Sequence, residues 1–336
     1  MRHRQSGRLL TGAAALVAGL FLVTACSGSG ADTPDDTDQT AGSGELRTIH
    51  VSAPPSYNAL TLHVAEAEGY FAEEGLKLEI VPTVGAEAVP QLLGGSLQFM
   101  LGDVVTLVRA QSEGVPLVIA APSVLLDAPG DEAYSSVLIR TADAEKYTSA
   151  ADIAGGSFGI PSVNSQPWLD VRTLVEEAGG DPDSIQFTEV PNPLQALRQG
   201  QVDFVTAPQP TVSAGVLEGD VTILTPLVLE DMGGIIGYPY LTTSDLVESD
   251  PALVQSFRRA LIKANTLINS DRELALEVAA TYLDVPEEVL QASTLPVLGE
   301  EMPTVEDMQK HIDRIVAAGI IAADDAPKAA DLLAKQ

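Results

Sequence analysis

The sequence predicts an α/β fold made of two similar units, and two observations carry that prediction. The first is an opening pattern of strand, loop, helix and strand. It consists of a β-branched run at Thr48 to Ser52, apolar residues at helical spacing over Leu60 to Glu68, and a second strand-like run at Leu76 to Val81. The second is a repeat of this pattern later in the chain. Together they favour two lobes, each built on an open sheet.

The repeat is clearest at two strands that begin with glycine. Gly95 to Gly102 and Gly200 to Ala207 each follow a short apolar helix, and each continues as a strand into a turn of small residues. Further upstream, Ser157 to Ile160 corresponds to the opening strand, and Ile185 to Val190 corresponds to the second strand. With a helix over Trp168 to Ala178, the second unit is complete. The chain therefore carries two βαβαβ units.

Other segments connect these units. Leu117 to Ala120 and Ser136 to Arg140 are strand-like, and we expect a loop between them at Pro122 to Glu132. Ile235 to Thr243 is predicted to be a strand that returns to the first lobe. The lobes are therefore expected to comprise residues 48–123 with 231–336, and residues 124–230.

The remainder of the chain is predicted to be helical. Asp250 and Asp271 stand where they can cap helices, and Thr304 to Asp307 has the form of a capping box. Phe257 and Leu261 belong to an apolar stripe at helical spacing. We expect these C-terminal helices to pack on the first lobe.

The N-terminus has the pattern of a lipoprotein signal peptide over residues 1–25. Arginines precede an apolar run from Leu9 to Val23, and Val23 to Cys26 resembles the lipobox of bacterial lipoproteins. Cys26 is the only cysteine, so it is the predicted lipid attachment site. Residues 26–47 hold this cysteine and a Gly-, Ser- and Asp-rich tether. We therefore expect an extracytoplasmic protein that a lipid anchors to the cell membrane.

Composition excludes one large class of partners. The formal charge is −29, with 18 Lys and Arg against 47 Asp and Glu. Because nucleic-acid binding needs clustered basic residues, we expect no nucleic-acid partner.

Several motifs resemble one family. Gly69 to Leu76 resembles a segment of ABC-transporter substrate-binding lipoproteins, in the branch for nitrate, sulfonates, taurine and thiamine-pyrimidine precursors. Leu93 to Gly102 and Leu197 to Phe204 resemble that branch's L-x-x-G-x-x-D-F segment, although Gln98 replaces the usual Asp. Ser149 to Ile160 is similar to its entry into the second lobe, without the usual Lys.

The resemblance implies a two-lobed periplasmic-binding-protein fold of type II with a hinged cleft. It further implies a small-molecule ligand and delivery of that ligand to ABC permease and ATPase subunits. We expect a monomer with no cofactor, no metal and no enzymatic activity.

Candidate ligand-binding residues follow from the rule that open α/β sheets bind ligands at the carboxyl ends of their strands. They are Ser56, Tyr57, Asn58, Glu87, Asp103, Asn164, Ser165, Trp168, Gln209 and Tyr238. None is basic, two are acidic, and several offer aromatic rings or amides. The predicted ligand is a neutral or cationic molecule with a flat ring, such as a pyrimidine precursor. A sulfonate, taurine or nitrate held at helix N-termini is the alternative.

Some of these residues have a second interpretation. Asp103 precedes an apolar helical stripe, so it is expected to cap that helix and to contact ligand as a second role. Trp168 either stacks on ligand or packs in the core. Tyr57 has no apolar stripe to join, which favours the cleft. Asn164 and Ser165 are expected to be helix caps.

An enzyme and a protein-binding receptor are the rival classes. Gly155 to Gly159 fits G-x-S-x-G, but Ser157 leads into a strand, whereas a nucleophilic serine follows one. Some relatives of the pyrimidine-precursor binders are enzymes that consume one of their own histidines, and His63 gives that idea only slight support. A receptor would predict a large exposed apolar patch rather than two lobes lined by turns.

Overall fold

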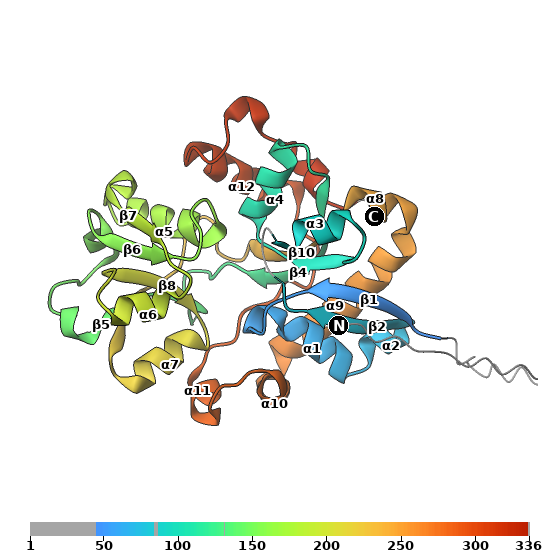
Figure 1. Ribbon diagram of the computed structural model, residues 1–336, viewed down its shortest axis with the longest axis horizontal. Coiled ribbons are helices and arrows are strands. Elements are labelled where there is room, and N and C mark those ends of the chain that lie inside the picture. The colour runs from blue at the N-terminus through green and yellow to red at the C-terminus, as the bar shows by residue number, and fades with distance from the viewer. Residues whose placement is uncertain (1–44, 84–86, 131, 335–336) are drawn as a thin grey trace, which may run out of the picture. The chain divides into compact units, whose positions relative to one another are not determined.

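The computed structural model describes residues 45–83, 87–130 and 132–334. The predicted signal peptide, Cys26 and nearly all of the tether lie outside these residues. Two five-stranded sheets form the framework, and they occupy separate regions in Figure 1. We call sheet A with the elements packed on it lobe I, and sheet B with its helices lobe II. The residue boundaries predicted for the lobes stay predictions.

Sheet A has the strand order β2-β1-β3-β10-β4. Its strands are β1 (Arg47–Ser52), β2 (Leu76–Val81), β3 (Phe99–Leu101), β4 (Leu117–Leu125) and β10 (Ile236–Thr243). Strand β1 pairs in parallel with β2 and β3, whereas β10 runs antiparallel to both β3 and β4. The predicted return of β10 to the first sheet is therefore confirmed.

Sheet B repeats this plan with the order β7-β6-β8-β5-β9. Its strands are β5 (Ser135–Arg140), β6 (Ser157–Ile160), β7 (Gln186–Glu189), β8 (Phe204–Pro208) and β9 (Val221–Pro226). Strand β6 is parallel to β7 and β8, and β5 is antiparallel to β8 and β9. The first three strands of each unit thus occupy equivalent places, which confirms the repeat seen in the sequence.

Helices flank both sheets (Figure 1). Those before lobe II are α1 (Leu60–Ala67), α2 (Tyr70–Glu73), α3 (Val89–Leu93) and α4 (Val104–Ser112). Lobe II contains α5 (Gln166–Glu177), α6 (Pro193–Arg198) and α7 (Thr211–Glu218). The C-terminal helices are α8 (Ser244–Ser249), α9 (Pro251–Ser270), α10 (Arg272–Tyr282), α11 (Glu287–Ala292) and α12 (Val305–Ala317).

Helix α9 packs its apolar stripe on lobe I, as predicted. Phe257 is fully buried, and its ring stacks on Phe99 of β3 with 3.7 Å between the ring centroids. The same apolar cluster contains Ile49 and Val51 of β1. Because α9 joins the core of the first sheet, the C-terminal helices are part of lobe I.

The predicted helix caps are confirmed. Asp250 and Asp271 accept backbone N–H bonds from residues three positions later, and Thr304 and Asp307 form a reciprocal capping box at the start of α12. In each case the side chain satisfies an N–H group that has no partner within its helix.

Strand β4 corrects one sequence-based expectation. It continues through Pro122 to Leu125, where a loop was predicted. The pairing of β4 with β10 shifts register between Tyr238 and Tyr240, whose partners are Val124 and Ala121. Pro122 lies at this irregularity, where a strand tolerates a residue without an N–H group.

The end of the chain also contacts β4, on the side away from β10. Leu333 forms a parallel bridge with Ile119, and the backbone N–H of Ala334 donates to the carbonyl of Ile119 at 3.1 Å. Residues 333–334 thus cover part of the outer edge of β4.

The described residues contain no helix that is both long and apolar enough to span a membrane.

Candidate functional site

A cavity of about 150 Å³ lies where strands of lobe I end, and we call it the cleft pocket. Its described lining residues are Pro54, Asn58, Met100, Leu101, Gly102, Asp103, Thr106 and Tyr238. Pro54 follows β1, and Gly102 and Asp103 follow β3, in agreement with the strand-end rule. Three predicted site residues, Asn58, Asp103 and Tyr238, are thus brought together.

Asp103 is the acidic group of this pocket. As predicted, it caps α4: one carboxylate oxygen accepts the backbone N–H of Thr106 at 2.8 Å, and the other accepts the Thr106 hydroxyl at 2.8 Å. The backbone N–H of Gln166, the first residue of α5 in lobe II, also acts on the carboxylate and favours its charged form. Burial raises the pKa of Asp103, although these hydrogen bonds act in the opposite direction.

Asn58 is held by tyrosines. Its side-chain oxygen accepts the hydroxyl of Tyr134 at 2.7 Å, and its backbone oxygen accepts the hydroxyl of Tyr240 at 3.5 Å. Tyr134 directly precedes β5, so this bond joins the two lobes. The bond from Tyr134 sets the orientation of the Asn58 amide. The other end of that amide, its NH₂ group, is a hydrogen-bond donor.

Tyr238 connects the cleft pocket to a second, very small cavity of about 20 Å³. That cavity is also lined by Asp127, Tyr134 and Asp170. Burial, reinforced by the carboxyls of Asp170 and Asp103, raises the pKa of Tyr238 well above its ordinary value. Its hydroxyl therefore stays protonated and can both donate and accept a hydrogen bond.

The prediction that Asn164 and Ser165 cap α5 through side-chain hydrogen bonds is wrong. Ser165 occupies the N-cap position, but its hydroxyl donates to the carbonyl of Ser162 at 2.7 Å and makes no cap bond. Asn164 has a left-handed backbone with a φ of 55°, and its carbonyl accepts Arg109 of α4 at 3.4 Å. Both residues shape the turn before α5.

The structure does not decide between the two roles predicted for Trp168, stacking on ligand and packing in the core. Its ring is partly exposed and lies 5.6 Å from that of Phe187, with the Arg172 guanidinium 4.8 Å above it. It also packs against an apolar cluster of lobe I. Trp168 is not among the described residues that line the cleft pocket.

The other predicted residues lie outside this pocket. Tyr57 is fully buried in the apolar cluster of lobe I, so the expectation that it joins no such cluster is wrong. Gln209 is buried and accepts the backbone N–H of Ser213 at 3.1 Å. The carbonyl of Ser56 accepts the Tyr282 hydroxyl at 3.0 Å, and Glu87 is exposed. Ligand contacts by any of the ten residues stay predictions.

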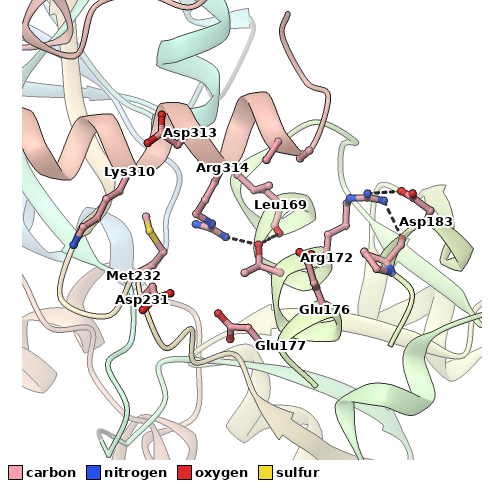
Figure 2. A pocket seen from close by; sticks show the side chains of 14 residues that line it. Leu169, Arg172, Glu176, Glu177, Asp183, Asp231, Met232, Lys310, Asp313 and Arg314 are labelled. Carbon is pink, nitrogen blue, oxygen red and sulfur yellow. Dashed lines mark hydrogen bonds and ion pairs between the residues drawn. The ribbon is translucent and has the colours of Figure 1, made fainter. Parts of the chain in front are cut away.

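A larger cavity of about 560 Å³ lies between α5 and α12 (Figure 2). Arg314 extends from α12 toward α5. Its guanidinium donates to the Thr173 hydroxyl at 2.8 Å and also lies 3.2 Å from the carboxylate of Asp170, which the figure does not draw. Burial raises the pKa of Asp170 to about 6, and the nearby Arg314 works against this shift. Sequence reasoning missed this pair because 144 positions separate the two residues.

The sheets and the cleft pocket define a periplasmic-binding-protein fold. Solved structures share it: an alkanesulfonate-binding protein from Xanthomonas axonopodis pv. citri bound to MOPS superposes with a TM-score of 0.69 at 17% identity, covering 87% of this chain and 99% of that one. The nitrate-binding protein of Synechocystis PCC 6803 superposes with a TM-score of 0.66 at 12% identity, covering 85% of each chain.

The chain belongs to the NMT1/THI5-like family, which matches residues 56–273. It is also similar to the formylaminopyrimidine-binding protein of Halalkalibacterium halodurans. The two are 27% identical over 259 residues, which cover 74% of each protein.

Proposed function

We propose that this protein is an extracytoplasmic solute-binding lipoprotein of an ABC importer. It captures a small heterocycle, with a pyrimidine precursor as the favoured class, and delivers it to a membrane permease with its ATPase. One observation carries the choice of ligand: the cleft pocket combines Asn58, Asp103 and Tyr238 with no basic residue among its described lining.

Each group can pair with an aminopyrimidine. The Asp103 carboxylate accepts hydrogen bonds from an amino group, and the amide of Asn58 both donates and accepts. Tyr238 offers a ring face and a protonated hydroxyl. The similarity to a formylaminopyrimidine-binding protein supports the same class.

A sulfonate or nitrate is the second candidate, because the fold is shared with binders of those anions. Fold alone does not select the ligand. An anion near Asp103 would meet a carboxylate rather than a basic side chain.

Calorimetry on the purified protein, with a formylaminopyrimidine, MOPS and nitrate as probes, tests the proposal. Before calorimetry, mass spectrometry of small molecules released on denaturation shows whether a ligand copurified with the protein. We expect the formylaminopyrimidine to bind and the two anions not to bind. Binding of MOPS or nitrate alone would contradict the proposed class.

The Asp103→Asn variant tests the role of the carboxylate. Asn caps helices as well as Asp does, so the stability of the fold should change little. Loss of a charge-assisted hydrogen bond should weaken binding by about 1.5–3 kcal/mol. Asp271→Asn is the matched control, because Asp271 caps α10 in the same way and does not line the pocket. If Asp103→Asn and Asp271→Asn bind the ligand with equal affinity, Asp103 does not contribute to the binding site.

A further inference from the structure

Helix α5 belongs to lobe II, yet part of it is held by lobe I. Its residues Val171 and Val175 pack in the core of lobe II with Phe158 of β6. Leu169 instead is buried in an apolar cluster of lobe I that contains Met308 of α12. The N-terminal half of α5 is therefore docked on the other lobe.

A buried ion pair accompanies this docking. Nη2 of Arg314 lies 3.2 Å from Oδ1 of Asp170 and donates to the Thr173 hydroxyl at 2.8 Å. The Asp170 side chain is only 3% exposed, and that of Arg314 is 16% exposed. Removing α5 from α12 would leave both charges without this partner, so the pair favours the docked position.

Gln166 lies between this pair and the cleft pocket. The side-chain NH₂ group of Gln166 donates to Oδ1 of Asp170 at 2.8 Å, and Gln166 is fully buried. The backbone N–H of the same residue faces the Asp103 carboxylate, which lines the pocket, and acts to lower its pKa. Arg314, Asp170, Gln166 and Asp103 thus form one continuous chain of contacts across the two lobes.

We propose that Arg314 and Asp170 form a latch that holds α5 against lobe I and thereby sets the ligand affinity of the cleft pocket. Neither side chain lines that pocket, so both act as positioning residues. This inference rests on the proposed function, because it assumes that ligand binds the conformation in which the lobes are closed. If the closed conformation is populated for a smaller fraction of the time, the apparent affinity for ligand falls in proportion to that fraction.

The test compares Arg314→Met with Arg198→Gln. Met keeps a long apolar side chain beside Leu169, so α12 can still fold and pack. Arg198 pairs with Glu218 and Asp220 inside lobe II, which makes it a control for the loss of a paired guanidinium. Circular dichroism and thermal unfolding establish that each variant is folded, and Arg314→Lys, which keeps the charge, serves as the conservative variant.

Two measurements follow lobe closure. Small-angle scattering reports the radius of gyration without ligand, and the emission of Trp168, the only tryptophan, reports whether α5 has left lobe I. We expect Arg314→Met to have a larger radius and red-shifted emission, and to bind a formylaminopyrimidine about tenfold more weakly. Arg314→Lys should restore part of each effect, and Arg198→Gln should match the wild type.

A folded Arg314→Met variant with the radius and emission of the wild type would overturn the latch. Failure of the wild-type protein to bind a formylaminopyrimidine would instead contradict the proposed ligand. The radius and emission of the ligand-free proteins test the latch in either case.

Discussion

His311 should make the stability of this protein depend on pH. It lies on α12, is 0% exposed, and its Nε2 donates to the carbonyl of Ile236 at 2.9 Å. Burial, with a smaller contribution from the nearby Arg314, lowers its pKa from 6.5 to about 3. The folded protein therefore keeps the ring neutral at a pH where the unfolded chain protonates it.

The sign and size of the effect follow from linkage. Because the folded-state pKa lies below the unfolded value, this contribution is complete above pH 6.5 and is lost as pH falls toward 3. At 1.36 kcal/mol per pKa unit, the free energy of unfolding falls by about 2 kcal/mol between pH 7 and pH 5 on account of His311. Asp170 acts in the opposite direction. Its pKa is raised to about 6, so it stabilises the fold by about 1 kcal/mol over the same interval.

The assay is urea unfolding of the wild type and His311→Gln at pH 7 and pH 5, followed by circular dichroism. Gln retains a donor for the carbonyl of Ile236 but does not titrate. Asp170 is present in both proteins, so its contribution cancels in the difference. We expect the wild type to lose about 2 kcal/mol more than the variant between the two pH values. His50→Gln controls for replacing an exposed imidazole. Equal losses in wild type and His311→Gln would refute the reasoning.

Three further predictions concern the core, the tryptophan and the anchor. Phe257→Ala should lower the free energy of unfolding by about 3–5 kcal/mol, because it empties a stacked position in the core; a cost below 1 kcal/mol in urea unfolding would contradict this. Trp168→Ala should cost less than Phe257→Ala in the same assay, because the indole is partly exposed. Cys26→Ala should move the protein from the membrane fraction to the soluble fraction on immunoblots, and wild-type retention would argue against lipid attachment.

Local signals in the sequence predicted much of the fold. Leu76–Val81 and Ser157–Ile160 match their predicted strands at both ends, because glycine or a turn bounds each β-branched or apolar run. The caps at Asp103 and Thr304 involve partners three residues away, so sequence spacing alone identifies them. The loop predicted to begin at Pro122 was wrong, because the place of Pro122 in β4 depends on a register shift against β10, a strand distant in the chain.

The candidate site was less predictable for the same reason. Asn58 and Tyr134 meet across 76 positions, and no local pattern pairs them. Tyr57 has no helical stripe of its own, yet its ring is buried by elements from far along the chain. A residue's place in a loop after a strand predicts its neighbourhood. Whether its side chain turns into the pocket or the core depends on tertiary packing.

The position of β10 in sheet A has a consequence for the order in which the lobes form during synthesis. All strands of sheet B are contained in the chain up to Pro226, whereas sheet A needs β10 between β3 and β4. Lobe II can therefore assemble on the ribosome while β3 and β4 still lack the strand that joins them. Sheet A waits for residues up to Thr243, and the segments that bridge β4, residues 297–299 and 333–334, follow β10 in the chain. Until then, β4 is an uncovered strand edge that other chains could pair with.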